Sequence, residues 1–243
     1  MIECMRKEVD KMNKLNINYW SDYACPFCYI GKSNLEAAIK ELGLENQVEM
    51  QMLSFELDPS APKEYMGEAT DLLAQKYGIS REQASEQIKR VEDMGKEAGI
   101  VLDYANALYT STFDAHRLTK LAQEKLPLHQ ANQFIARVFK AMFEDHTMMS
   151  DLETLKRIAL EYGLSEEDID TVIKTDAYAK DVRLEENLAS QYNVTAVPYF
   201  IFANKYAVPG ALPKDQMKEV LTKIMAEENI VVEGASCGID GCQ

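Results

Sequence analysis

The sequence contains no segment of the kind that enters or crosses a membrane. Within its 243 residues there is no run of about 20 apolar side chains, which a membrane-spanning helix needs. The first residues are rich in Lys, Glu, Asp and Asn and lack the apolar core of a secretory signal peptide. We therefore expect a cytoplasmic protein without a membrane partner, in a compartment where permanent structural disulfides are rare.

Basic residues are too few and too scattered for a surface that binds nucleic acid. The chain has 26 Lys and Arg against 40 Asp and Glu, which gives a net charge of −14. No cluster of basic side chains is available to bind phosphates, and the acidic residues are spread along the chain as on a solvated surface. With 47% hydrophobic residues, the chain can form one sizeable core, or a core with an inserted subdomain.

Residues that ligate metals are also scarce. There are 3 histidines and 5 cysteines, and one pair of cysteines has the C-x-x-C spacing. A structural zinc site takes about four ligands, usually from a second C-x-x-C or paired histidines, so we expect no metal. The pair in Cys25-Pro26-Phe27-Cys28 is instead typical of a dithiol redox centre beside a β-α-β unit. Two buried structural cysteines are the alternative, which the Pro-Phe context does not favour.

The cysteine pair follows a predicted strand and opens a predicted helix. Residues 15–20 alternate apolar and polar side chains, and residues 29–42 carry apolar side chains at helical spacing. Free backbone N–H groups and the helix dipole stabilise a thiolate at a helix N-terminus, so Cys25 is the predicted nucleophile. Pro26 suits the first helical position, and Cys28 is predicted to point inward and resolve the mixed disulfide.

A second signal lies far away, where Pro198 begins an apolar, β-rich run. An X-Pro bond is the common site of a cis peptide. A cis bond here would turn the backbone of Val197 toward the cysteines, ready to pair with an extended substrate. A trans proline at the first residue of a strand is the ordinary alternative.

The remaining pattern divides the chain into segments. A β-α-β unit ends with a predicted strand at 48–55, and helical patterns then follow one another, with a capping box at Ser80 and Gln83. A predicted hairpin and a closing helix complete an α/β, thioredoxin-like fold, in which a mixed sheet (β-α-β, then β-β-α) carries a large all-helical insertion. The predicted segments are an N-terminal extension at 1–14, the thioredoxin-like domain at 15–62 and 192–229, the helical insertion at 63–191 and a Cys-containing tail at 230–243.

Four motifs follow one another along the chain. They are Asp22-Tyr23-Ala24-Cys25-Pro26-Phe27-Cys28-Tyr29-Ile30-Gly31-Lys32, Ser54-Phe55-Glu56-Leu57-Asp58-Pro59, Thr112-Phe113-Asp114-Ala115-His116-Arg117-Leu118 and Val197-Pro198-Tyr199-Phe200. Together they resemble the FrnE-like branch of the DsbA family, over roughly residues 15 to 230. That branch shares its fold with 2-hydroxychromene-2-carboxylate isomerases and kappa-class glutathione transferases, which carry serine at the position of Cys25 and use glutathione.

With both cysteines present, the resemblance implies a thiol:disulfide oxidoreductase of protein or small-molecule thiols and disulfides. Val197, Pro198 and Phe27 are the expected substrate-binding residues, and Phe27 and Trp20 offer an apolar surface unless they belong to the core. No cofactor is expected beyond glutathione as a redox partner. Two alternatives stay open: a glutathione-dependent isomerase or transferase of the 2-hydroxychromene-2-carboxylate isomerase type, and a redox-regulated, chaperone-like binding protein.

Two further side chains are candidates for auxiliary roles. In the family, the segment that carries His116 approaches the active site, where an imidazole could exchange a proton with Cys25 or stabilise its thiolate. A helix-packing histidine bonded to a backbone carbonyl is the alternative. Asp22 could help proton exchange with Cys28, or it could cap the turn after the strand.

The C-terminal segment holds Cys237 and Cys242, with two glycines between them that would permit a small closed loop. We favour a second redox pair that exchanges with the C-x-x-C pair. A metal site completed by distant ligands and a tail with incidental thiols are the alternatives. We assign Cys4 no role.

Overall fold

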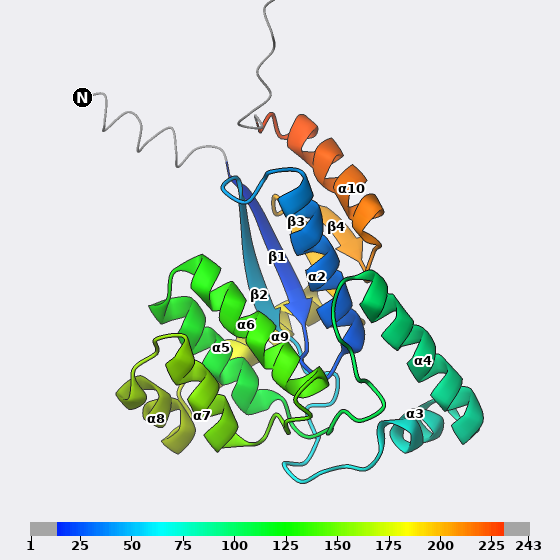
Figure 1. Ribbon diagram of the computed structural model, residues 1–243. Helices are drawn as coiled ribbons and strands as arrows, with labels where there is room; N and C mark the ends of the chain where they lie inside the picture. The colour runs from blue at the N-terminus through cyan, green and yellow to red at the C-terminus, as the bar shows by residue number, and fades with distance from the viewer. Residues whose placement is uncertain (1–13, 231–243) are drawn as a thin grey trace, which may run out of the picture.

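The computed structural model describes residues 14–230, so the predictions for Cys4, Cys237 and Cys242 lie outside the described residues. Its centre is a four-stranded mixed sheet of order β2-β1-β3-β4 (Figure 1). The strands are β1 (Leu15–Ser21), β2 (Val48–Ser54), β3 (Tyr199–Phe202) and β4 (Tyr206–Pro209). β1 pairs with β2 in parallel and with β3 antiparallel, and β3 and β4 form the predicted hairpin. The predicted mixed sheet is therefore confirmed.

The burial of β1 changes along its length. At its start, Leu15 and Ile17 are buried and Asn16 between them is exposed, as on a strand with one solvated face. At its end, both faces are covered, and the indole N–H of Trp20 donates a 2.9 Å hydrogen bond to the backbone carbonyl of Glu185. Trp20 is 1% exposed, so the suggestion that it presents an apolar surface to substrates is wrong.

Two helices flank the sheet within the thioredoxin-like part. α2 (Pro26–Glu41) follows β1, and α10 (Lys214–Glu227) closes the fold and packs against α2. Figure 1 shows the two helices side by side next to β3 and β4. The buried face of α10 carries Met217, Leu221, Ile224 and Met225, which are spaced as an amphipathic helix requires.

A helical insertion separates β2 from β3. It contains α3 (Ala69–Tyr77), α4 (Arg81–Glu97), α5 (Phe113–Lys125), α6 (Leu128–Phe143), α7 (Leu152–Glu161), α8 (Glu166–Lys174) and α9 (Ala179–Gln191). α6 and α9 pack against β2, and Figure 1 shows α5 to α8 gathered at that side of the sheet. The predicted capping box is present at the start of α4, where Ser80 and Gln83 bond each other's backbone N–H groups. None of the helices within residues 14–230 is long and apolar enough to span a membrane.

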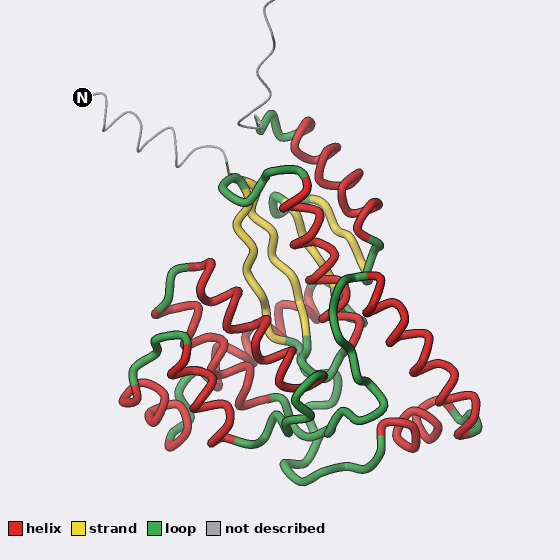
Figure 2. Tube along the Cα trace, viewed as in Figure 1, coloured by secondary structure: helices red, strands yellow, loops and turns green. Residues whose placement is uncertain are grey.

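A buried lysine fastens the insertion to the sheet. Lys120 on α5 donates from Nζ to the carbonyl of Met52 on β2 at 3.1 Å and to the carboxylate of Glu185 on α9 at 2.6 Å. Burial lowers the pKa of Lys120, and the charge of Glu185 partly offsets this effect. Several loops lie at the C-terminal end of β1 and β2. Figure 2 shows these loops coming together near the start of α2. The insertion thereby encloses the junction that carries the two cysteines.

Candidate dithiol active site

Cys25 is the N-cap residue of α2. Its backbone is extended, with φ −98° and ψ 111°, and Pro26 takes the first helical position as predicted. The Cys25 carbonyl accepts hydrogen bonds from the N–H groups of Cys28 at 3.0 Å and Tyr29 at 3.4 Å. The first turn of α2 contains no acidic residue, so no carboxylate there competes with a thiolate for the positive end of the helix.

The loop before β3 meets Cys25 from the other half of the fold. The Val197–Pro198 peptide bond is cis, so of the two alternatives the structure has the one that turns the loop toward the cysteines. The sulfur of Cys25 lies 3.6 Å from the carbonyl oxygen of Val197, a contact across 172 positions of sequence. Cys25 itself is 4% exposed. The structure therefore brings the predicted nucleophile and the predicted substrate-binding loop together in a largely desolvated position.

Gly31 sets how closely α2 approaches this loop. A Cβ atom at this position would lie 3.0 Å from Cγ of Pro198 and 3.3 Å from the backbone Cα of Ala211. Alanine favours a helix interior by up to about 1 kcal/mol over glycine, but overpacking costs about 1–3 kcal/mol. We expect Gly31→Ala to lower the free energy of unfolding in urea, whereas Ser33→Ala on the same helix should not. A Gly31→Ala protein more stable than wild type would contradict this packing argument.

Cys28 lies behind Cys25 and is 1% exposed. Its sulfur accepts a 3.5 Å hydrogen bond from the backbone N–H of Asp22. Burial raises the pKa of the Cys28 thiol well above its ordinary value, and the neighbouring Cys25 raises it further, whereas contacts with Ser21 and Asp22 act against the shift. Cys28 is therefore a thiol at neutral pH, as a resolving cysteine is until it attacks.

The raised pKa of Cys28 predicts a pattern of alkylation. In the folded, reduced protein, iodoacetamide should modify Cys28 negligibly at pH 7, and the rate should rise only well into the alkaline range, because the thiolate is the reacting form. In denaturant, the same cysteine should titrate near the ordinary value of about 8.5. Mass mapping of each cysteine against pH measures this. Labelling of native Cys28 at neutral pH as fast as in denaturant would contradict the prediction.

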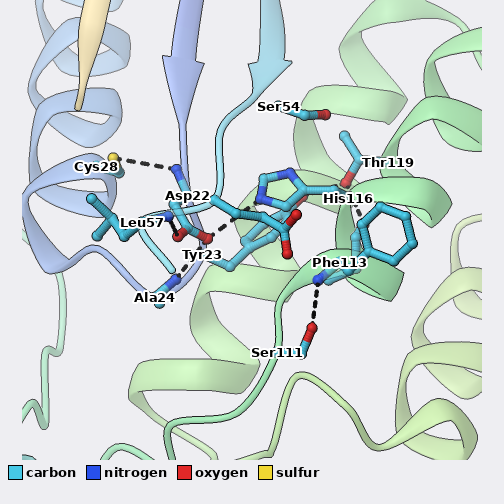
Figure 3. A network of polar contacts seen from close by, with 12 residues as sticks. Asp22, Tyr23, Ala24, Cys28, Ser54, Leu57, Ser111, Phe113, His116 and Thr119 are labelled. Carbon is cyan, nitrogen blue, oxygen red and sulfur yellow. Dashed lines mark hydrogen bonds and ion pairs between the residues drawn. The ribbon is translucent and has the colours of Figure 1, made fainter. Parts of the chain in front are cut away.

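The carboxylate of Asp22 is the hub of the polar network in Figure 3. Its Oδ2 accepts a 2.7 Å hydrogen bond from the N–H of Leu57, and its Oδ1 accepts one of 3.3 Å from the N–H of Ala24. Oδ1 also lies 3.3 Å from Nε2 of His116. Asp22 thus caps the turn, as one alternative predicted, and also contacts a titratable side chain beside the dithiol.

His116 is fully buried on α5, and its imidazole ring packs at 5.2 Å from the ring of Tyr23. The alternative of a histidine bonded to a backbone carbonyl is not what the structure has, because Nε2 faces the carboxylate of Asp22. Nδ1 is buried and has no hydrogen-bond partner among the described residues. The structure thus brings His116 next to Asp22 and, through the backbone of Asp22, into one network with Cys28.

Sequence reasoning missed two tyrosines near Cys25. Tyr104 and Tyr109 lie in the segment between α4 and α5, with ring centroids 6.3 Å apart. Burial raises the pKa of Tyr109 well above its ordinary value, and Tyr104 and the charges of Cys25 and Asp22 raise it further. The hydroxyl is therefore protonated near the dithiol. No spacing pattern marks these residues, because they belong to neither a helix nor a strand.

Three of the exposed side chains around the dithiol are apolar. Phe27, between the two cysteines, is 39% exposed, and Leu57 and Met66 are 40% and 38% exposed. The backbone places the last two at the site, because Leu57 bonds Asp22 and the N–H of Met66 bonds the carbonyl of Tyr109. Within the described range, no three His, Cys, Asp or Glu side chains gather as ligands for a metal ion.

Two comparisons with known proteins point to one family, and two others show similarity in sequence or in fold. A model of DSBA-like thioredoxin domains matches residues 16–222. The chain is 32% identical to a structure described as a probable DsbA oxidoreductase from Streptomyces coelicolor, with a TM-score of 0.81, covering 94% of this chain and 98% of that one. It is 28% identical to the uncharacterized protein YwbO of Bacillus subtilis over 86% of this chain and 96% of that protein. A 2-hydroxychromene-2-carboxylate isomerase is similar in fold, with a TM-score of 0.63 at 12% identity and coverage of 89% and 100%.

Proposed function

The chain belongs to the family of DsbA-like thioredoxin domains, which makes it a thiol:disulfide oxidoreductase with a C-x-x-C pair, and we propose how this pair works. Cys25 attacks and Cys28 resolves. One observation carries this assignment: the sulfur of Cys25 stands at the start of α2, 3.6 Å from the Val197 carbonyl, while Cys28 is buried behind it.

In the reducing direction, the Cys25 thiolate attacks one sulfur of a substrate disulfide. A mixed disulfide forms, and the other substrate sulfur leaves as a thiolate. Cys28 then loses its proton and attacks the sulfur of Cys25, so that the Cys25–Cys28 disulfide closes and the second substrate thiolate leaves. Two electrons pass from the dithiol to the substrate. The same steps in reverse oxidise a substrate dithiol.

Val197 and Pro198 are proposed to hold an extended substrate next to Cys25, and Phe27 to contact its apolar side chains. An extended peptide could pair with backbone groups of the loop, as in strand addition. The exposed rings and chains of Phe27, Leu57 and Met66 favour peptide segments with apolar residues near cysteine. Protein and peptide thiols are therefore the proposed partners, with glutathione as a small-molecule redox partner.

Asp22 and His116 are proposed to accept the proton of Cys28 when it attacks. A buried thiol whose pKa is raised reacts slowly unless a base lies nearby. The backbone N–H of Asp22 contacts that thiol at 3.5 Å, and the Asp22 carboxylate lies 3.3 Å from Nε2 of His116, so two titratable groups belong to the same network. The expected cytoplasmic location and the exchange of Cys237 and Cys242 with the dithiol remain part of the proposal.

The test uses the full-length protein and a synthetic peptide with one disulfide. In glutathione buffers at neutral pH, the wild-type protein should speed equilibration of the peptide between its disulfide and dithiol forms well beyond the buffer alone. Separation of the acid-quenched forms by mass measures the rate. Equilibration at the rate of the buffer alone would overturn the proposal.

A further inference from the structure

Three buried ionisable residues form a row of contacts that starts at the dithiol, and a fourth buried carboxyl lies beside it. Cys28 and Asp22 are each 1% exposed, His116 is fully buried, and Glu56 is 5% exposed. The backbone N–H of Asp22 contacts the sulfur of Cys28 at 3.5 Å, and its carboxylate contacts Nε2 of His116 at 3.3 Å. The proposed function uses the first three residues and leaves Glu56 unexplained.

Two independent observations place Glu56 beside this row. Glu56 precedes Leu57, whose N–H donates to the Asp22 carboxylate at 2.7 Å. The side chain of Glu56 is 1% exposed and pairs with Arg183 of α9. The guanidinium of Arg183 lies 4.3 Å from the ring centroid of Phe113, which is one helical turn before His116 on α5. Arg183 and Glu56 therefore lie over the part of α5 that carries the imidazole.

His116 has a free position for a further partner. Its Nε2 is occupied by Asp22, whereas Nδ1 is buried and without a partner among the residues that the structure describes. Figure 3 shows this second nitrogen pointing away from Asp22. Buried polar atoms are nearly always hydrogen-bonded, so an orphaned imidazole nitrogen marks a bridging water or a role in proton exchange. An imidazole that binds Asp22 on one side can pass a proton on from the other.

The far end of the row reaches solvent at Arg183, which is 44% exposed. The charged groups that face Glu56 are Arg183 and Glu186 from α9 and His116 from α5. The carboxylate of Asp22 is bonded to the N–H of Leu57, the residue that follows Glu56. Elsewhere on α5, Asp114 is neutralised by Arg117 and by Lys63 from the loop after β2. Glu56 is thus the buried carboxyl between the imidazole and an exposed cation.

The environment of Glu56 suits proton transfer. Burial raises its pKa above the ordinary value, Arg183 and His116 act against this shift, and Glu186 adds to it. A carboxylate with a raised pKa is a stronger proton acceptor than an exposed one.

We propose that Glu56 is the outlet of a proton relay that serves Cys28. When Cys28 attacks the mixed disulfide, its proton passes to the Asp22–His116 pair and then to Glu56, which releases it to water beside Arg183. In the opposite direction, a substrate thiolate attacks Cys25, Cys28 leaves as a thiolate, and the relay returns a proton from water to it. The relay moves protons alone, and the electrons stay with the sulfur exchange. This inference rests on the proposed function of the dithiol.

The test measures the resolving step as a function of pH. Reduced full-length protein is mixed with oxidised glutathione, quenched in acid at increasing times and analysed by mass for the mixed disulfide and the closed Cys25–Cys28 pair. We expect Glu56→Gln to slow closure by on the order of tenfold and to remove the acidic limb of its pH profile. Glu56→Asp should restore part of the rate.

Glu186→Gln is the matched control. Glu186 also pairs with Arg183, at 2.6 Å, and it accepts a hydrogen bond from the backbone N–H of Glu56. Its loss disturbs the same ion-pair network and removes a charge that raises the pKa of Glu56, so closure should keep its maximal rate and its acidic limb, with the limb moved to lower pH. A Glu56→Gln protein with a lower melting temperature but the wild-type profile would show a structural ion pair and overturn the relay. Absence of glutathione adducts and of closure in wild type would instead overturn the proposed function.

Discussion

Cys25→Ser is expected to lower disulfide exchange by on the order of a thousandfold or more, to the rate of the buffer alone. A serine hydroxyl is not ionised near neutral pH and forms no disulfide. Cys28 cannot replace Cys25, because it is 1% exposed and burial keeps its thiol protonated. The measurement is the initial rate of peptide disulfide reduction by the reduced full-length protein, followed by mass after acid quench.

Cys28→Ser is the companion variant, and it should lose the second step of the reaction instead of the first. Cys25 keeps its place at the start of α2, so the first attack should proceed and the reaction should stall at the mixed disulfide. One substrate thiolate is then released per protein molecule, without turnover. For the first variant, Cys25→Ser, sustained turnover would show that other cysteines carry the activity. That result would contradict the assignment of Cys25 as the nucleophile.

Asp22→Asn is expected to slow the resolving step by on the order of a hundredfold, the size of a lost general base. The variant keeps the shape of the side chain but removes the charge that faces His116. The carboxylate of Asp22 accepts hydrogen bonds from the N–H groups of Ala24 and Leu57. In the variant, the amide NH2 group cannot accept, so one of these two hydrogen bonds is lost. We therefore expect a loss of unfolding free energy of about 1–3 kcal/mol as well. Single-turnover closure and urea denaturation measure the two effects separately.

Asp58→Asn is the control for a nearby carboxylate. Asp58 is exposed and bonds the N–H of Ser60 at 3.0 Å and its hydroxyl at 2.6 Å, without contact with the dithiol network. In the Asp58→Asn protein, the rate at which the Cys25–Cys28 disulfide closes and the free energy of unfolding should stay near those of wild type. If Asp22→Asn closes its disulfide as fast as Asp58→Asn does, the Asp22 carboxylate plays no part in proton transfer from Cys28.

Features that depend on short stretches of sequence were predictable. The C-x-x-C pair at a strand-to-helix junction, Pro26 at the first helical position and the Ser80–Gln83 capping box follow from spacing and capping chemistry. Gly78 ends α3 in the left-handed region, with φ 63°, as a glycine after a helix does. The cis bond at Val197–Pro198 did not follow from the local pattern, because a proline at a strand start is usually trans.

Features that depend on distant contacts were not predictable from local patterns. Trp20 is buried because α9, which follows more than 150 residues later, covers the second face of β1 at that point. The pairing of Glu56 with Arg183 joins a loop after β2 to the same helix. Tyr109 lies in a loop without periodicity, so no pattern connects it to Cys25. The placement of these residues depends on how the insertion folds against the sheet.

Locating the trapped mixed disulfide tests the central claim most directly. Reduced Cys28→Ser protein, with its other cysteines intact, is reacted with a peptide disulfide, alkylated, digested without reductant and mapped by mass spectrometry. We predict that the peptide is attached to Cys25, in an amount that approaches one per molecule. Attachment at Cys4, Cys237 or Cys242 with Cys25 alkylated instead would contradict it, because the reacting thiol would then lie outside the α2 junction.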